Sequence, residues 1–234
     1  MISIHQSQFL PWLPYFYKIL KSDIFIIMDD VQFQKNGVQN RNSIKTPIGE
    51  IYLTIPVSTK SNTLINEVEI SNGNTLNKIL KTIQMNYAKS KYFEQVFPKI
   101  EELFAQKKYT KLHDLNNDLL LMILELLGSK TTIRYSSEFK LSSKKDDLVL
   151  DLIMKNGENE YISGHGGLDY MDLDKFHKHN IKVYLYEFKY HEYRQLWNEQ
   201  GFVPYLSIID LLFNDLENAY EYILKNGSIE LIPR

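Results

Sequence analysis

The chain has 234 residues, of which 44% are hydrophobic and 24% charged, a balance typical of a globular protein with a sizeable core. Its formal net charge of −2 excludes a general basic surface for nucleic acid, and the absence of cysteine excludes disulfides, thiolate catalysis and cysteine-ligated metals. Neither a secretory leader pattern nor an apolar stretch of about 20 residues, the length that spans a membrane, is evident. We therefore expect a cytoplasmic protein that forms a single domain over residues 1–234.

The start of the chain predicts two parallel strands joined by a helix. Residues 2–5 are a short strand, residues 13–21 carry apolar side chains at helical spacing, and residues 24–28 are a continuous apolar run. Such a run is typical of a strand buried on both faces. A strand, a helix and a second strand in so short a segment form a βαβ unit, whose two strands lie parallel.

The next segment is polar and predicts mainly loops. We expect a loop over residues 29–47 with a turn at Asn36 and Gly37, and alternating strands over 51–57 and 65–70. Pro56 favours a position near a sheet edge for the first of these strands, and Asn72 to Asn74 predict another turn. The alternating residues 51–70 also offer a surface through which a homodimer could pair.

Three amphipathic helices follow, and then strands alternate with helices to the end of the chain. The three helices are expected over residues 76–88, 92–106 and 112–127. The later elements are expected as strands over 131–135, 160–162 and 181–187, and helices over 144–154, 169–179, 204–215 and 216–225. This order predicts an α/β fold with a mostly parallel sheet flanked by helices, and a helical insertion over about residues 75–128.

Polar side chains gather where the first two strands end. His5, Gln6 and Gln8 follow the first strand, and Asp29, Asp30 and Gln32 follow the second. Since ligands of α/β proteins bind outside the carboxyl ends of the strands, these side chains should share one rim. Adjacent side chains on a strand point to opposite faces, so only one of the two aspartates is expected to face a given ligand, and no metal site is predicted.

A glycine-rich segment follows the strand over 160–162 and consists of Ser163, Gly164, His165, Gly166 and Gly167. Such a loop before a helix can present backbone N–H groups to a phosphate, and a histidine in it can bind phosphate or transfer a proton. The alternative is a tight turn with an exposed histidine.

Two further polar clusters have competing interpretations, and three other histidines are expected to lie outside any site. His191, Tyr193 and Gln195 follow a strand, and Asn40, Arg41 and Lys45 lie in the polar segment, where Arg41 could hold a carboxylate or phosphate by two hydrogen bonds. Either cluster could instead be a solvated loop. We expect a structural role for His113 and solvent exposure for His177 and His179.

A series of motifs, taken together, resembles the WbqC-like family over nearly the whole chain. The motifs are His5 to Trp12, Tyr15, Phe16, Asp29 to Phe33, Asn40 to Asn42, Ile44 to Thr46, Leu53 to Val57, Tyr87, Lys91 to Phe93, Ser163, Gly164, Tyr190 to Gln195, and Leu206 to Asn214. The sequence departs from the family pattern at Ser7, Pro14 and Glu192, where proline, glycine and proline are usual. Members of this family sit with genes for bacterial surface polysaccharide, notably O-antigen, so the resemblance implies work on a nucleotide-activated sugar.

The favoured hypothesis is a transferase that adds an acyl or formyl group to the amine of a nucleotide-linked amino sugar. The donor, such as acyl-coenzyme A or formyl-folate, stays unidentified. We predict His5 as the general base, with Asp29 or Asp30 beside it and His165 in the glycine-rich loop. The predicted substrate-binding residues are Gln6, Gln8, Gln32, Asn40, Arg41, Lys45, Ser163, Gly164, Gly166, Gly167, His191, Tyr193 and Gln195. Within that set, Arg41 and Lys45 are expected to hold the diphosphate.

Two alternatives stay open. One is a non-catalytic module that presents a sugar nucleotide or a lipid-linked sugar to a membrane glycosyltransferase. The other is a nucleotidyl- or adenylate-forming enzyme with the layout of the HIGH-type nucleotidylyltransferases, which would require ATP and magnesium. In this chain the segment from Pro11 to Tyr15 stands where those enzymes carry two signature histidines, and both histidines are absent.

Overall fold

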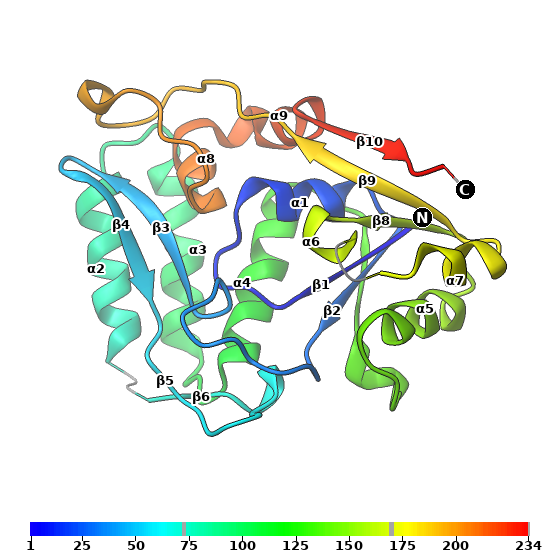
Figure 1. Cartoon of the computed structure of the whole chain (residues 1–234). Coiled ribbons are helices and arrows are strands. Elements are labelled where there is room, and N and C mark those ends of the chain that lie inside the picture. The colour runs from blue at the N-terminus through cyan, green and yellow to red at the C-terminus, as the bar shows by residue number, and fades with distance from the viewer. Residues whose placement is uncertain (72–73, 169–170, 234) are drawn as a thin grey trace.

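The computed structural model describes residues 1–71, 74–168 and 171–233, and a six-stranded sheet forms its centre (Figure 1). The strand order is β10-β9-β8-β1-β2-β7, in which β9, β8, β1, β2 and β7 are parallel and β10 is antiparallel to β9. The strands of this sheet are β1 Ile2–Gln6, β2 Ile24–Met28, β7 Thr132–Tyr135, β8 Glu160–Ser163, β9 Lys182–Phe188 and β10 Gly227–Leu231.

Helices cover both faces of the sheet, because its central strands are apolar on both sides. Phe25 and Ile27 face one core with α1, α4, α8 and α9, whereas Ile4 and Ile26 face a second core with α5 and α7. This arrangement confirms the predicted α/β class. The helices are α1 Leu13–Leu20, α2 Thr75–Tyr87, α3 Phe93–Gln106, α4 Leu112–Leu126, α5 Lys145–Lys155, α6 His165–Leu168, α7 Leu173–Lys178, α8 Ile208–Asp215 and α9 Ala219–Lys225.

The predicted elements with strong apolar periodicity occur where expected. β1 and β2 pair in parallel from Ile2 opposite Ile24 to Gln6 opposite Met28. The three middle helices α2, α3 and α4 begin and end within one residue of the predicted limits. Their apolar faces pack into the larger core, and this burial is what stabilises them.

The prediction of a loop over residues 29–47 is wrong for its second half. Arg41–Thr46 form strand β3, which pairs antiparallel with β4, Gly49–Thr54. The expected strand over 51–57 is also divided at Pro56, and β5 (Val57–Ser58) pairs with β6 (Glu69–Ile70). The polar side chains of β3 give no strand pattern in the sequence, because their hydrogen-bond partners come from distant parts of the chain. The alternating segment 51–70 thus forms its pairs within this chain.

The end of the chain also differs from prediction. The penultimate helix begins at Ile208, four residues later than expected, and strand β10 follows the last helix. Gly227 opens β10 against the Tyr17 ring, where an added Cβ atom would lie 2.1 Å from the ring, so only glycine fits. The predicted turn at Asn72 and Gly73 and the predicted helix start at residue 169 lie outside the described residues.

The order of the strands creates a switch point. The chain runs from β1 to β2 and β7 on one side, and then crosses to β8 and β9 on the other side of β1. In open α/β sheets the crevice at such a point, outside the carboxyl ends of the strands, is where ligands bind. Among the described residues, no helix is long and apolar enough to cross a membrane.

Candidate functional site

His5 lies at the carboxyl end of β1, beside this switch point. Its Nδ1 atom is 3.2 Å from the Gln6 carbonyl oxygen, and its ring stands edge-on to Tyr15 at 5.1 Å. Nε2 makes no hydrogen bond to a described residue. A proton on Nδ1 would satisfy the carbonyl group and leave the Nε2 lone pair free to accept another proton. This geometry suits a general base.

The surroundings of His5 keep it neutral. Burial and, to a lesser extent, the charge of Lys18 lower its pKa to about 3. Lys18 is 2% exposed and donates from Nζ to the Ile4 carbonyl oxygen at 3.0 Å, and burial lowers its pKa to about 7. Lys18 was not predicted as part of the site, because a lysine on an amphipathic helix is usually solvated.

Two predicted amides carry unpaired oxygens, and one of them, Gln8, lies beside His5. Gln8 is buried, with Nε2 at 3.4 Å from His5 Nδ1 and with Oε1 unpaired. Asn40 donates to the Ile55 carbonyl oxygen at 2.9 Å, and its Oδ1 is also unpaired. Gln6 accepts a hydrogen bond of 2.7 Å from Gln39. Buried amide oxygens without a donor cost free energy, and a ligand with hydroxyl groups would supply donors.

The glycine-rich segment lies across the switch point at the end of β8. Ser163 is buried, and α6 begins at once with His165. An added Cβ atom on Gly164 would lie 3.1 Å from the Tyr186 ring, and one on Gly167 would lie 2.7 Å from Ser163 Oγ, whereas Gly166 is open. Two of the three glycines therefore permit close packing. Because α6 has only four residues, its backbone is a weak cradle for phosphate.

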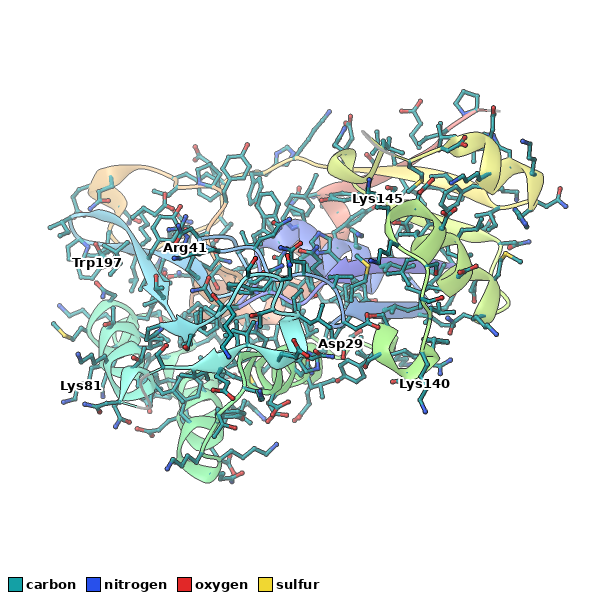
Figure 2. All side chains as sticks on the ribbon, turned by 60° about the horizontal axis from the view of Figure 1, so that its bottom comes forward. Asp29, Arg41, Lys81, Lys140, Lys145 and Trp197 are labelled. Atoms are coloured by element: carbon teal, nitrogen blue, oxygen red, sulfur yellow. The ribbon has the colours of Figure 1, made fainter. Side chains whose placement is uncertain are left out.

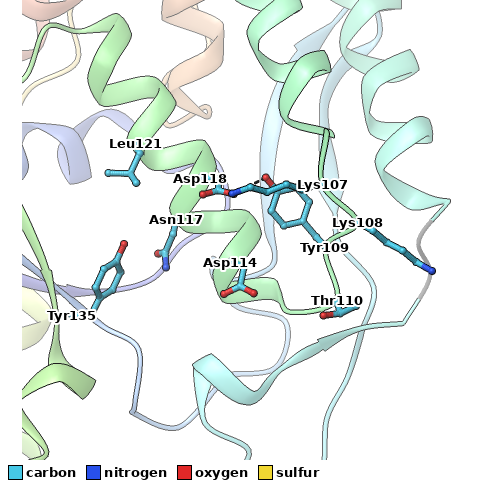
Figure 3. A pocket seen from close by; sticks show the side chains of 9 residues that line it. All are labelled: Lys107, Lys108, Tyr109, Thr110, Asp114, Asn117, Asp118, Leu121 and Tyr135. Carbon is cyan, nitrogen blue, oxygen red and sulfur yellow. Dashed lines mark hydrogen bonds and ion pairs between the residues drawn. The ribbon is translucent and has the colours of Figure 1, made fainter. Parts of the chain in front are cut away.

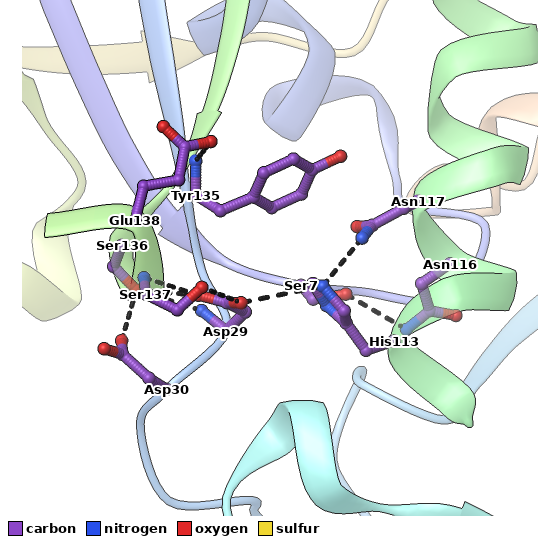
Figure 4. Close-up of polar contacts among 10 residues, drawn as sticks. All are labelled: Ser7, Asp29, Asp30, His113, Asn116, Asn117, Tyr135, Ser136, Ser137 and Glu138. Atoms are coloured by element: carbon purple, nitrogen blue, oxygen red, sulfur yellow. Dashed lines mark hydrogen bonds and ion pairs between the residues drawn. The ribbon is translucent and has the colours of Figure 1, made fainter. Parts of the chain in front are cut away.

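Asp29 is held at the end of β2 by two serines that the sequence analysis missed (Figure 4). Its Oδ1 accepts from Ser136 Oγ at 3.0 Å and from the Ser137 N–H at 3.0 Å, and its Oδ2 accepts from Ser137 Oγ at 2.7 Å. The Ser136 hydroxyl also contacts Asp30. The expectation that the two aspartates face apart is wrong, because β2 ends at Met28 and strand alternation does not reach them.

His113 on α4 faces the same carboxylate. Its Nε2 atom is 3.6 Å from Asp29 Oδ2 and 2.8 Å from the Asn117 side-chain nitrogen. Burial lowers the pKa of His113, although Asp29 opposes that shift. His113 Nδ1 and the side-chain oxygens of Asn116 and Asn117 are buried and unpaired. The spacing of residues 113, 116 and 117 was the available signal, because it places all three on one helix face.

Contacts join the His5 side of this edge to the Asp29 side. Asn116 donates to Ser7 Oγ at 3.3 Å and to the Gln39 carbonyl oxygen at 2.9 Å. Burial raises the pKa of Tyr15, and Tyr135 nearby contributes to that shift. The ring of Tyr135 in turn stands edge-on to His113 at 5.6 Å. The two neutral histidines thus flank one polar and aromatic cluster.

A cavity of about 420 Å³ opens beside this cluster, across the first half of α4 (Figure 3). Tyr135 and Asn117, which contact His113, form one side of it, and Lys107 and Lys108 lie on the other. Its volume is in the range of small-ligand pockets. Among the described residues, no group of three or more histidine and acidic side chains is placed to hold a metal ion.

Two predicted binding residues lie outside this cluster. Gln32 is exposed and donates to the Asn62 side chain at 3.3 Å. The Arg41 guanidinium lies 5.0 Å from the centre of the Tyr52 ring and is well separated from Asp29 (Figure 2). It makes no hydrogen bond to a described residue, so it is free to bind an anion.

Three further predicted residues, Lys45, Tyr193 and Gln195, belong to a separate network around Asp210. Neither Asp210 nor Tyr87 was predicted as part of a site. Lys45 donates to Gln195 Oε1 at 3.1 Å, and Gln195 and Tyr193 donate to Asp210 Oδ2 at 2.9 and 2.7 Å. About 13 Å of strand separates Lys45 from Arg41, and their predicted joint hold on a diphosphate stays a prediction. His191 is exposed, and its carbonyl oxygen accepts from the Tyr222 hydroxyl.

Comparisons with known proteins agree with the motifs noted in the sequence. The profile of the WbqC-like protein family matches residues 6–222. The chain is similar to the uncharacterized protein Rv1507c of Mycobacterium tuberculosis, with 32% identity over 225 residues, which cover 95% of this chain and 96% of that protein. No solved structure matches the chain.

Proposed function

The chain belongs to the WbqC-like protein family, and from this premise we propose that it is a transferase of bacterial surface-polysaccharide (O-antigen) biosynthesis. Its proposed substrate is a nucleotide-linked amino sugar, and the proposed reaction adds an acyl or formyl group to the amine of that sugar. We place the reaction in the cytoplasm. The donor belongs to the class of acyl-coenzyme A or formyl-folate compounds.

The observation that carries this proposal is the state of His5. It lies at the switch point of the sheet, is neutral at pH 7, and has its Nε2 atom free while Nδ1 faces a carbonyl oxygen at 3.2 Å. A general base needs an unprotonated nitrogen that points away from its structural partner. A free Nε2 could also accept a hydrogen bond from a bound hydroxyl group, so turnover by the His5 variant decides between a base and a binding contact.

The chemical step uses this nitrogen as a proton acceptor. The sugar amine attacks the carbonyl carbon of the donor, and a carbon–nitrogen bond forms. His5 Nε2 takes the proton that the amine loses. The bond between the carbonyl carbon and the leaving group, a thiolate or a folate nitrogen, then breaks, and the proton passes to that leaving group.

Unpaired amide oxygens at this edge of the sheet and around His113 support a substrate rich in hydroxyl groups. Gln8, Asn40 and Asn117 each have a buried side-chain oxygen without a donor, and sugar hydroxyl groups are donors. We assign the cavity of about 420 Å³ beside His113 to part of the nucleotide sugar. Arg41 does not line this cavity, and its role at the diphosphate stays a prediction. The roles predicted for Asp30, Gln32 and His165 stay predictions.

The test combines a ligand screen with turnover by three proteins. Nucleotide sugars, ATP with magnesium, and acyl or formyl donors are screened by the rise in melting temperature that a ligand of the folded state causes. Turnover of the best pair is then followed by mass spectrometry. His5→Gln should lower kcat by about 10²–10⁴-fold and leave the nucleotide-sugar shift intact. His179→Gln, which changes an exposed histidine, serves as the matched control and should behave as wild type.

Three results would contradict the proposal. Unchanged turnover in His5→Gln would remove His5 as the base. A nucleotide sugar that binds without turnover under any donor would favour the non-catalytic binding module. A melting shift with ATP and magnesium alone would favour the nucleotidyl- or adenylate-forming alternative.

A further inference from the structure

A second cavity, of about 180 Å³, lies between β3 and the segment that follows β9. Lys45, Arg194, Gln195 and Asn198 are among its lining residues. It is separate from the carboxyl edge of the sheet. Trp197, in the segment that borders this cavity, and Asp29, at that edge, are far apart in Figure 2. This cavity has no role in the proposed transfer reaction.

Lys45 is a buried cation without a carboxylate partner. It is 1% exposed, and its Nζ atom donates to Gln195 Oε1 at 3.1 Å and to the Gly201 carbonyl oxygen at 2.6 Å. Both acceptors are neutral. An ammonium group has three donors, so one donor remains for a further acceptor. Burying an ammonium group without a direct ion-pair partner is costly. Burial lowers the pKa of Lys45, and the charges of Asp210 and Glu199 oppose that shift only in part, because neither carboxylate contacts Nζ.

The nearest buried carboxylate is already used. Asp210 accepts from the Tyr87 hydroxyl at 2.7 Å through Oδ1 and from Tyr193 and Gln195 through Oδ2. Gln195 stands between Lys45 and Asp210, donating to the carboxylate and accepting from the ammonium group. Lys45 forms no ion pair within the described part of the chain. Lys45 lines the cavity, so an anion bound there could supply a direct ion-pair partner.

Arg194 adds a second free cation at the same cavity. It is exposed and makes no hydrogen bond or ion pair with a described residue. A guanidinium group binds phosphate and carboxylate with two parallel hydrogen bonds. The cavity also has an acidic lining residue, Glu192, but its carboxylate is exposed and is screened by solvent.

We infer that this cavity is a binding site for a small oxyanion of the phosphate type, with Lys45 at its floor and Arg194 at its rim. The anion supplies a negative charge in direct contact with the Lys45 ammonium group and accepts a hydrogen bond from its third N–H group. The side-chain amide of Asn198 offers an additional donor on the wall. A phosphoryl compound would supply this oxyanion, and the experiment distinguishes it from a carboxylate, which would contradict the inference.

The experiment measures binding of inorganic phosphate, pyrophosphate and acetate to the full chain by isothermal titration calorimetry at constant ionic strength. Wild-type protein should bind phosphate or pyrophosphate saturably and bind acetate at least 10-fold more weakly. Arg194→Gln removes an exposed side chain and should fold normally, and it should weaken phosphate binding about 10-fold or more. Lys45→Met should abolish binding.

A matched control separates a site from general attraction to positive charge. Lys81→Gln removes an exposed lysine on α2 and should leave binding unchanged. Equal affinity in wild type and Arg194→Gln, equal loss in Lys81→Gln, or absence of saturable binding in wild type would each overturn the inference. Preferred binding of acetate would contradict it too, because the ligand would then be a carboxylate. If Lys45→Met fails to fold, Arg194→Gln decides the outcome.

Discussion

Two carboxylates among the described residues are buried, those of Asp29 and Asp210, and their surroundings differ. Each accepts hydrogen bonds on both of its oxygens. Asp210 reaches its cation only through the amide of Gln195, and none of its direct partners has an unpaired buried polar atom. Asp29 instead faces the neutral His113 at 3.6 Å, and unpaired atoms surround that histidine.

This difference separates two uses of a buried acid. Around Asp210, tyrosine and glutamine side chains satisfy the carboxylate and tie β3 to α8, so the network contributes to stability. Around Asp29, the carboxylate is held rigidly while the neighbouring groups still lack partners, as is expected where a ligand completes the hydrogen bonds. We therefore expect changes at Asp210 to affect mainly folding and changes at Asp29 to affect mainly the site.

The largest expected effect is on the stability of Asp210→Ala. This change leaves two tyrosine hydroxyls and a glutamine amide buried without an acceptor, and it should lower the free energy of unfolding by about 3–5 kcal/mol. Urea unfolding measures the loss. The control is Asp29→Ala, for which we expect a smaller loss of stability, because Ser136 can still donate to Asp30 and Ser137 is only partly buried. A lower stability of Asp29→Ala than of Asp210→Ala would contradict the distinction between the two carboxylates.

A second test uses pH, because burial lowers the pKa values of the histidines in one region and raises the pKa of Asp210 in the other. The pKa values of His5 and His113 are lowered below 6.5, so the unfolded chain binds more protons and stability falls as pH drops below 6.5. Burial raises the pKa of Asp210 above 3.8, so acid favours the folded state at that group. Each histidine should contribute at most about 1.4 kcal/mol per pH unit.

The measurement is urea unfolding of wild type and His5→Gln between pH 4 and pH 7. Glutamine does not bind a proton, so the variant should lose stability less steeply as pH falls from 6.5. Parallel curves for the two proteins would mean that His5 is solvated like an ordinary surface histidine.

The smallest expected effect concerns the support of Asp29. Ser137→Ala removes one hydroxyl donor at 2.7 Å and leaves Ser136 and the residue 137 N–H in place. Stability should fall by about 0.5–1.5 kcal/mol, the typical worth of one hydrogen bond. Thermal unfolding of this variant beside Ser58→Ala, an exposed serine in β5, gives the comparison. A loss above that range would show that the Asp29 group also has a large structural role.

Elements with apolar periodicity were predictable from the sequence, and elements with polar pairing were not. The run Ile24–Met28 and the three helices between residues 75 and 126 are stabilised by burial of their own side chains, so their pattern is visible locally. Strand β3 is stabilised by β4 and by contacts with the segment around residues 195–207, and β10 by β9. β4 follows β3 directly, but the other partners lie far along the chain and leave no local signal.

The same distinction applies to the candidate site. The rule that ligands bind at the carboxyl ends of strands located His5, Gln6, Gln8 and Asp29 on one edge, because strand ends can be read from the sequence. His113, Ser136 and Ser137 were missed, because only the packing of α4 and β7 against β2 brings them to Asp29. Lys45 and Arg41, close in sequence, were grouped together although they face different surroundings.

The sequence by itself determined the α/β class, the order of the main helices and strands, and the edge at which polar groups gather. These features follow from hydrophobic periodicity and chain order, which are local properties. Only the tertiary structure decided the pairing of Asp29 with His113, the burial that keeps His5 neutral, and the unmatched charge of Lys45. Those properties depend on desolvation and on distances between segments remote in the chain, and a linear pattern records neither.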